Sequence, residues 1–283
     1  MTSHPPTPLH WVHDLSPFLI QFSDGVGIRY YGLAYLLGFA LCGWILYRAA
    51  QVQRLRLAPS AVADMMTTLV VGVLLGGRLG YFVFYEPQVL FRAPWQILQV
   101  WDGGMSSHGG FIGVGVALAW FARGHKIRFW HLTDAVVAVA PLGVALGRIA
   151  NFINGELWGK VSDWKYAVIF PASAPPDTPA WQIAPRHASQ LYQSVLEGWL
   201  LFAFLQWRFW RTSAASSSPG RITGEFLIGY AIARIIGEMF REPDASLILG
   251  LSRGTFYSLF MILAGATVIW RSQQSQPLPS RTP

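Results

Sequence analysis

Leu132–Ile153 reads LTDAVVAVAPLGVALGRIANFI, and this stretch decides the fold class of the chain. Its length suits the roughly 30 Å hydrocarbon core of a bilayer, because an α-helix rises about 1.5 Å per residue. Only Asp134 near its start and Arg148 near its end carry a charge. The stretch therefore predicts a transmembrane helix with an arginine close to one end.

The whole chain has the composition of a polytopic membrane protein. Of its 283 residues, 53% are hydrophobic and 12% are charged, whereas a soluble domain carries roughly 25% charged residues. This balance excludes both a soluble globule and a disordered chain. We expect an all-α protein with about seven transmembrane helices, at residues 29–49, 61–85, 106–122, 132–153, 187–207, 222–240 and 254–270.

Basic residues predict the orientation of these helices. Eleven of the 21 Lys and Arg residues lie in the segments around the ends of the first, third, fifth and seventh spans, and seven lie in the opposite segments. The richer side is cytoplasmic by the positive-inside rule, so the N-terminus is periplasmic and the C-terminus cytoplasmic. Because topology accounts for the net charge of +7, we expect no nucleic-acid partner.

The regions outside the helices are predicted as follows. Residues 1–28 form a periplasmic or interfacial segment, 29–271 the transmembrane domain, and 272–283 a polar cytoplasmic tail. Within the domain, residues 86–105 form an amphipathic arm at the membrane interface, because tryptophans and aliphatic residues recur there. Residues 155–185, which contain five prolines, form a small non-helical periplasmic head.

The single cysteine, Cys42, limits the chemistry available to the chain. It excludes an intramolecular disulfide and a cysteine-based zinc site, and its apolar surroundings argue against a nucleophile. The N-terminal 23 residues lack a basic segment followed by an apolar core, so we expect no signal peptide there. Leu41 stands where a lipoprotein cleavage site has a small residue, so the chain itself is not expected to be a lipoprotein.

Polar residues inside the predicted helices gather at one depth. Arg78, Arg148 and Arg234 come late in spans that run toward the periplasm, and Tyr31 and His108 come early in spans that run away from it. Each arginine near a bilayer centre costs roughly 2.5–3.5 kcal/mol. Their common position in the outer half of the membrane predicts a functional site there.

The sixth span carries a charged stripe. Tyr230, Arg234, Glu238 and Arg241 have the spacing of one helix face. Arg234 and Glu238 are predicted to form an ion pair, which reduces the unfavourable burial of either charge. The alternative is an interhelical ion pair that only holds the bundle together.

Two further segments contain groups suited to acid–base or phosphate chemistry. Arg148 lies one turn before Asn151, and a guanidinium fork can bind two phosphate oxygens. His108 is followed by Gly109-Gly110, which leaves space around a ring that can accept a proton near neutral pH. The alternatives are an ordinary capped helix end and a structural histidine.

Glycines surround the third membrane arginine. Gly72, Gly76 and Gly80 repeat every four residues around Arg78, and this spacing predicts close packing of the second span against another helix. Nucleotide-binding and zinc-protease motifs do not occur in the sequence.

At these residues the chain resembles the bacterial prolipoprotein diacylglyceryl transferases. The resemblance rests on Ser107–Gly110 and on Gly147–Gly159, GRIANFINGELWG, where Ala150 replaces the glycine of many members. Shorter supporting matches are Tyr30-Tyr31-Gly32, Gly76–Tyr81, Pro185–Tyr192 and the stripe Tyr230–Arg241.

The resemblance implies a multi-pass enzyme of the bacterial inner membrane with its site toward the periplasm. It implies that phosphatidylglycerol donates its diacylglyceryl group to the lipobox cysteine of a prolipoprotein signal peptide, and that neither a metal nor another cofactor is needed. A thioether forms and glycerol 1-phosphate leaves.

That chemistry assigns roles to the candidate residues. Arg148 and Arg234 bind the phosphate, oriented by Asn151 and Tyr31. Glu238 holds Arg234 and Glu156 supports the site, while His108 is the candidate base, with either glutamate as the alternative. The other substrate-binding candidates are Arg78, Gly159, Tyr230 and Arg241.

Two other functions use the same polar residues. A transporter or proton relay would place them along a pathway, and a lipid-binding subunit would hold phospholipid without reacting. A transporter predicts polar groups in both leaflets and paired broken helices, whereas here they gather at one depth and the sequence shows no internal repeat.

Overall fold

The computed structural model describes residues 10–99, 103–243 and 246–274, which form two compact units. The first unit contains residues 1–42 and 137–283, and the second contains residues 43–136. Two long helices, α1 (Tyr30–Gln51) and α5 (Phe129–Ile153), contribute residues to both units.

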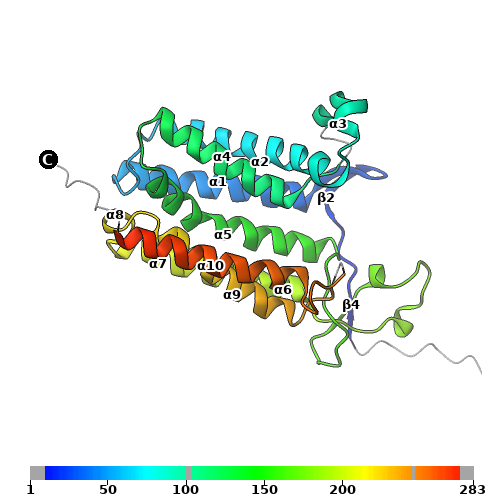
Figure 1. Ribbon diagram of the computed structural model, residues 1–283. Coiled ribbons are helices and arrows are strands. Elements are labelled where there is room, and N and C mark those ends of the chain that lie inside the picture. Colours follow the sequence, from blue (N-terminus) through cyan, green and yellow to red (C-terminus); the bar gives the residue numbers. More distant parts are fainter. Residues whose placement is uncertain (1–9, 100–102, 244–245, 275–283) are drawn as a thin grey trace, which may run out of the picture. The chain divides into compact units, whose positions relative to one another are not determined.

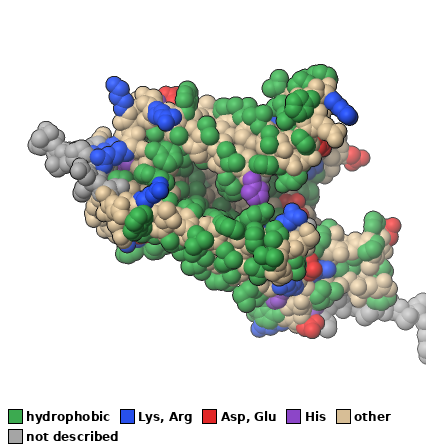
Figure 2. All heavy atoms as spheres, in the orientation of Figure 1, with side chains coloured by type: hydrophobic (Ala, Val, Ile, Leu, Met, Phe, Trp, Pro, Cys, Tyr) green, Lys and Arg blue, Asp and Glu red, His purple; other side chains and the backbone are tan. Residues whose placement is uncertain are grey.

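Each of the seven predicted stretches is helical (Figure 1). Within the described residues, α1, α2, α5 and α10 are the four helices long and apolar enough to span a membrane. Many large hydrophobic side chains are exposed on the surface (Figure 2), as expected for helices in contact with lipid. Besides α1 and α5, the helices of these seven stretches are α2 (Ala61–Tyr85), α4 (Ser107–Gly124), α9 (Arg221–Glu238) and α10 (Arg253–Gln274). The remaining stretch is a continuous run of α6 (Ser189–Gln193), η5 (Ser194–Leu200) and α7 (Leu201–Arg211).

The fifth predicted helix differs from a regular α-helix in its middle turns. There, η5 is a π-helix. This conformation is rare in proteins, and where it occurs it often lies at a functional site. Gly198 lets it approach α5 closely, since a methyl group at that position would lie 2.5 Å from Ala145 Cβ. Ser194 Oγ also donates to Ala145 O at 2.9 Å. Both contacts are made to Ala145, so they fix the point along α5 at which η5 packs.

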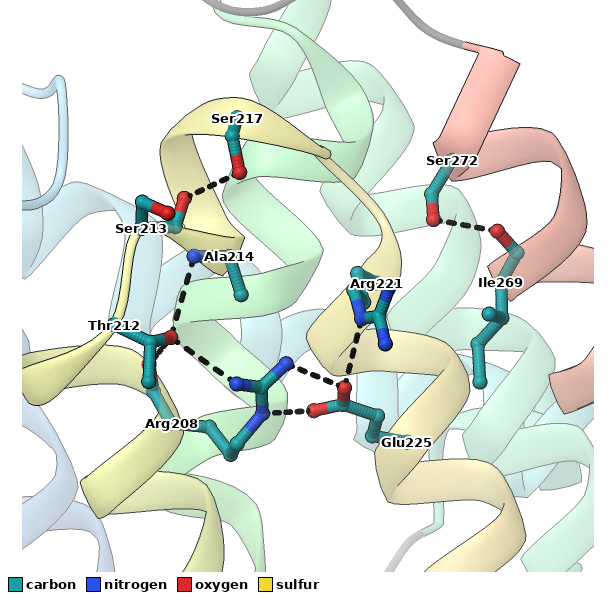
Figure 3. A network of polar contacts seen from close by, with 9 residues as sticks. All are labelled: Arg208, Thr212, Ser213, Ala214, Ser217, Arg221, Glu225, Ile269 and Ser272. Carbon is teal, nitrogen blue, oxygen red and sulfur yellow. Dashed lines mark hydrogen bonds and ion pairs between the residues drawn. The ribbon is translucent and has the colours of Figure 1, made fainter.

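A polar network joins α7 to α9 at the end of α9 that is far from Arg234 (Figure 3). Arg208 grips Glu225 with two hydrogen bonds, from Nε at 2.7 Å and from Nη2 at 2.6 Å. Arg221 Nε donates to the same carboxylate at 3.0 Å. Between α7 and α9 lies the short helix α8 (Ala214–Ser217). In the same unit, α9 packs along α10 (Figure 1).

The second unit is built on the packing of α2 against α4. A methyl group at Gly76 would lie 2.4 Å from Gly109 O, so only glycine permits this approach. The close packing predicted from the glycine spacing is therefore confirmed. The predicted arm contains two short turns, α3 (Val89–Arg92) and η1 (Pro94–Leu98), and its residues 100–102 lie outside the described residues.

The N-terminal segment forms strands, which the all-α prediction did not include. β1 (Trp11–Val12) pairs in parallel with β4 (Val168–Ile169) of the head, and β2 (Phe18–Ser23) pairs with β3 (Val26–Arg29) in a hairpin. The head also has two short 3₁₀ turns, η3 (Pro171–Ser173) and η4 (Ala180–Gln182). At the other end, α10 continues to Gln274, and the rest of the predicted tail lies outside the described residues.

Candidate active site

The carboxylate of Glu197 lies between two arginines in the first unit. Its Oε2 is 3.1 Å from Arg148 Nη2, and its Oε1 is 3.3 Å from Arg234 Nη1. The Glu197 side chain is fully buried, whereas each arginine side chain is 16% exposed. One anion thus gathers two cations from α5 and α9 and leaves both accessible from outside.

Neighbouring side chains complete this cluster. Arg234 Nη2 lies 2.6 Å from Glu238 Oε1 one turn later on α9, so the predicted ion pair is confirmed. Tyr230 lies one turn earlier on α9, on the same side as Arg234. With two arginines and two glutamates, the cluster is formally balanced in charge, which makes burial of all four groups possible.

The balanced charges leave capacity for a ligand. A guanidinium carries several N–H donors in a planar fork, and the ion pair of Arg148 with Glu197 uses its Nη2 atom. An anion that reached the cluster would meet two rigidly held forks. The arrangement suits recognition of a planar or tetrahedral oxyanion such as phosphate.

The turn that follows α5 holds the second group of candidate residues. Asn151 Nδ2 donates to Glu156 Oε1 at 2.6 Å, and the backbone N–H of Glu156 donates to Asn151 O at 3.1 Å. Gly155 has φ +66°, and Leu157 has φ +58°. A left-handed conformation is unusual for leucine and is found most often where function demands it.

Arg241 does not share the helix face predicted for it. α9 ends at Glu238, and Pro243 follows shortly, where a missing N–H and ring clashes oppose a continuing helix. Instead, the backbone of Arg241 pairs with that of Gly159. A methyl group at Gly159 would lie 2.5 Å from Phe240 O and 2.6 Å from His187 O, so this glycine permits the crossing of three backbone segments.

Aromatic residues surround His187 next to this crossing. The His187 ring contacts those of Phe240 and Tyr192, with centroids 5.4 and 5.8 Å away.

Tyr31 packs against a second tyrosine, Tyr35, that interacts with the Asn151–Glu156 turn. The rings of Tyr31 and Tyr35 are in contact, with centroids 5.1 Å apart. Tyr35 is also close enough to Glu156 to interact with its charge. Tyr31 is thus one aromatic ring away from a residue that senses the charge of the turn.

Comparison with known proteins identifies the family. The family model described as prolipoprotein diacylglyceryl transferase matches residues 17–271. The chain belongs to the prolipoprotein diacylglyceryl transferase family. Its relatives include proteins named phosphatidylglycerol–prolipoprotein diacylglyceryl transferase from Phenylobacterium zucineum, 41% identical over 95% of this chain and 97% of the relative, and from Rhodospirillum centenum, 43% identical over 95% of each. The resemblance seen in the sequence is confirmed.

Two candidate residues of this transferase family member belong to the second unit. Arg78 is buried and donates to backbone carbonyls of the arm, among them Gln96 O at 2.7 Å and Gln99 O at 2.6 Å. Its guanidinium thereby holds the arm. His108 is exposed on the first turn of α4, after Ser106, whose Oγ accepts from Gly109 N at 3.3 Å.

Glu197, which lies between the two arginines, was not among the predicted site residues. A signal was present, because Glu197 is the one acidic residue between 187 and 207 in the sequence. A carboxylate in such an apolar stretch requires a cationic or hydrogen-bonding partner. In the described part of the chain, no group of three or more His, Cys, Asp or Glu side chains is arranged to hold a metal ion.

Proposed function

We propose that this chain transfers the diacylglyceryl group of phosphatidylglycerol to the lipobox cysteine of prolipoproteins, in the inner membrane of a bacterium. The observation that carries the proposal is the convergence of Arg148 and Arg234 on Glu197. It supports a phosphate-binding site among apolar helices, as a phospholipid substrate requires. Membership of the family and the names of the relatives supply the reaction.

The reaction displaces a phosphate monoester from carbon. The cysteine sulfur, as thiolate, attacks the glycerol carbon of the diacylglyceryl group, and the bond from that carbon to the phosphate oxygen breaks. The electron pair of the broken bond stays on the phosphate, which leaves as glycerol 1-phosphate. Because negative charge grows on the phosphate, Arg148 and Arg234 bind the transition state more tightly than the lipid.

The remaining candidates serve these two arginines and the thiol. Glu197 and Glu238 hold the guanidinium groups in place, while Asn151 and Tyr31 orient the phosphate. His108 accepts the proton of the thiol, because an imidazole can take it near neutral pH. Glu156 and Glu238 are the alternatives for that step, although each already binds another side chain.

The proposed topology follows the distribution of basic residues. The seven helical stretches cross the membrane, with the N-terminus and the head in the periplasm and the C-terminus in the cytoplasm. Arg148 near the end of α5 and Arg234 in the second half of α9 then lie toward the periplasmic side. This placement puts the site where a secreted prolipoprotein presents its cysteine.

The decisive experiment uses purified full-length protein in phosphatidylglycerol micelles with a lipobox peptide. Release of glycerol phosphate together with conversion of the peptide to a diacylglyceryl thioether is expected. Arg148→Ala and Arg234→Ala should abolish both products while the protein still inserts and folds. Binding of lipid without product would indicate a lipid-binding subunit, and solute or proton flux without product would indicate a transporter.

The proton acceptor has its own test. His108→Gln should slow transfer most at neutral pH and recover as the pH approaches the thiol pKa of about 8.5. A defect of the same size at every pH would assign His108 to structure and leave Glu156 or Glu238 as the base.

A further inference from the structure

Two amide side chains on α6 lie between the Asn151–Glu156 turn and the arginine pair. Gln190 Nε2 donates to Glu156 O at 2.6 Å. Gln193 lies beside Glu197, because a methyl group at Gly237 on α9 would be 3.1 Å from Gln193 Cγ and 3.4 Å from Glu197 Oε1. The amides thus connect the two groups of candidate residues.

Most of the polar atoms of this amide pair have no partner. Gln190 and Gln193 are fully buried, yet among the described residues Gln190 Oε1, Gln193 Oε1 and Gln193 Nε2 have none. Buried amides that have lost water without gaining a hydrogen bond are unfavourable, and native proteins satisfy most of them. An unsatisfied pair next to an anion-binding cluster indicates a ligand that completes it.

The unsatisfied atoms define the chemistry of that ligand. The two carbonyl oxygens accept and the amide nitrogen donates, so a hydroxyl, which does both, is the group that fits. A phosphate oxygen only accepts and an ammonium only donates. In phosphatidylglycerol, hydroxyl groups lie on the glycerol attached to the phosphate that Arg148 and Arg234 would bind.

We propose that Gln190 and Gln193 recognise the hydroxyl groups of the phosphatidylglycerol headgroup and make the site specific for that lipid. The inference rests on the proposed function, because it assigns part of the same substrate. The amides lie on the run of helix that carries Glu197, so phosphate binding and headgroup recognition are fixed by one element. A site built to hydrogen bond a substrate hydroxyl rejects the analogue that lacks it.

The test compares two lipids that differ only in these hydroxyls. Phosphatidylpropanol keeps the diacylglyceryl group, the phosphate and a three-carbon headgroup but has no headgroup hydroxyl. Formation of the diacylglyceryl peptide measures kcat/KM for both lipids. The variants are Gln193→Leu and the control Gln206→Leu, since Gln206 on α7 already has partners in Ala138 O at 2.7 Å and Trp210 Nε1 at 2.8 Å.

The expected result is a change in lipid preference. The unmodified protein should use phosphatidylglycerol at least about tenfold better than phosphatidylpropanol. Gln193→Leu should remove this preference by slowing only the reaction with phosphatidylglycerol. Gln206→Leu should change both rates by the same factor and leave the ratio as it was.

Several results would overturn the inference. The first is an equal kcat/KM for both lipids with the unmodified protein. The second is an equal loss of kcat/KM with both lipids in Gln193→Leu. The third is a raised KM for the peptide in Gln193→Leu with an unchanged ratio between the lipids, which would place the peptide backbone at the amides. If Gln193→Leu does not fold, Gln193→Glu, which keeps an acceptor and loses the donor, must still lower the ratio. Absence of transfer from phosphatidylglycerol by the unmodified protein would instead refute the proposed function.

Discussion

The Glu197 carboxylate accepts a hydrogen bond from Arg148 at 3.1 Å across 49 residues of sequence. The same carboxylate holds Arg234, so two arginines separated along the chain share one buried anion. Without it, two guanidinium groups would repel each other in a region of low dielectric constant. Glu197 is therefore required for both arginines to occupy the site together.

Glu197→Gln is expected to disable the site. Removing one partner of a buried charge pair destabilises a protein by roughly 3–5 kcal/mol, and transfer should fall by at least about a hundredfold, as when a preorganised donor is lost. Thermal unfolding in micelles and the rate of peptide modification measure the two effects. Glu225→Gln is the control, because it breaks the network of Figure 3 and should affect stability more than the reaction. Equal activity losses in both variants would contradict a special role for Glu197.

Arg234→Lys tests the fork rather than the charge. Arg234 reaches Glu197 with Nη1 and Glu238 with Nη2, and a lysine ammonium cannot reproduce this planar geometry. We expect kcat to fall by about a hundredfold with the protein still folded. Arg221→Lys, at the start of the same helix and 38% exposed, should remain near full activity because exposed ion pairs contribute about 0–1 kcal/mol. Full activity of Arg234→Lys would show that positive charge alone suffices.

Local patterns in the sequence predicted the helices well. The span at 61–85 coincides with α2, and the first span differs from α1 by two residues at its end. Apolar length and flanking polar residues determine these limits, and both are local properties. The Arg234–Glu238 pair was predictable for the same reason, since one helical turn separates them.

Contacts between distant segments were not predictable in this way. The pairing of β1 with β4 joins residues 157 positions apart, and each strand has only two residues, so neither leaves a local pattern. The π-helix depends on the approach of Gly198 to Ala145 across a helix crossing. The prediction for Arg241 was wrong because it assumed that the helix continues to residue 241, whereas α9 ends at Glu238.

Gly254→Ala tests how tightly the Arg234–Glu238 pair is enclosed. A methyl group at Gly254, in the first turn of α10, would lie 2.6 Å from Glu238 Oε1 and 2.8 Å from Arg234 Nε. Because the ion pair must move to admit the methyl group, we expect the rate of transfer to fall by about tenfold. The free energy of unfolding should fall by no more than about 3 kcal/mol. Gly143→Ala on α5 meets no atom within 4 Å and should be neutral or slightly stabilising, by up to about 1 kcal/mol. Measured kcat in both variants decides, and an unaffected Gly254→Ala would show that the pair can shift without consequence.

His13 braces the Asn151–Glu156 turn from the N-terminal segment. Its Nε2 lies 2.7 Å from Phe152 O, and its ring would be 3.0 Å from a methyl group at Gly155. His13→Phe keeps an aromatic ring but leaves a carbonyl at the end of α5 without this partner, at a cost of about 1–3 kcal/mol.

We therefore expect His13→Phe to lower kcat by about tenfold and to speed hydrogen exchange at the backbone N–H of Glu156, which bonds to Asn151 O. His13→Gln retains a side-chain amide able to donate to the same carbonyl and should recover much of the rate. A loss of stability in His13→Phe without a change in kcat or in exchange at Glu156 would mean that the N-terminal segment only secures the head. A parallel loss of kcat and of protection at Glu156 would instead make the N-terminal segment around His13 part of the catalytic unit, because the turn that positions Asn151 would depend on it.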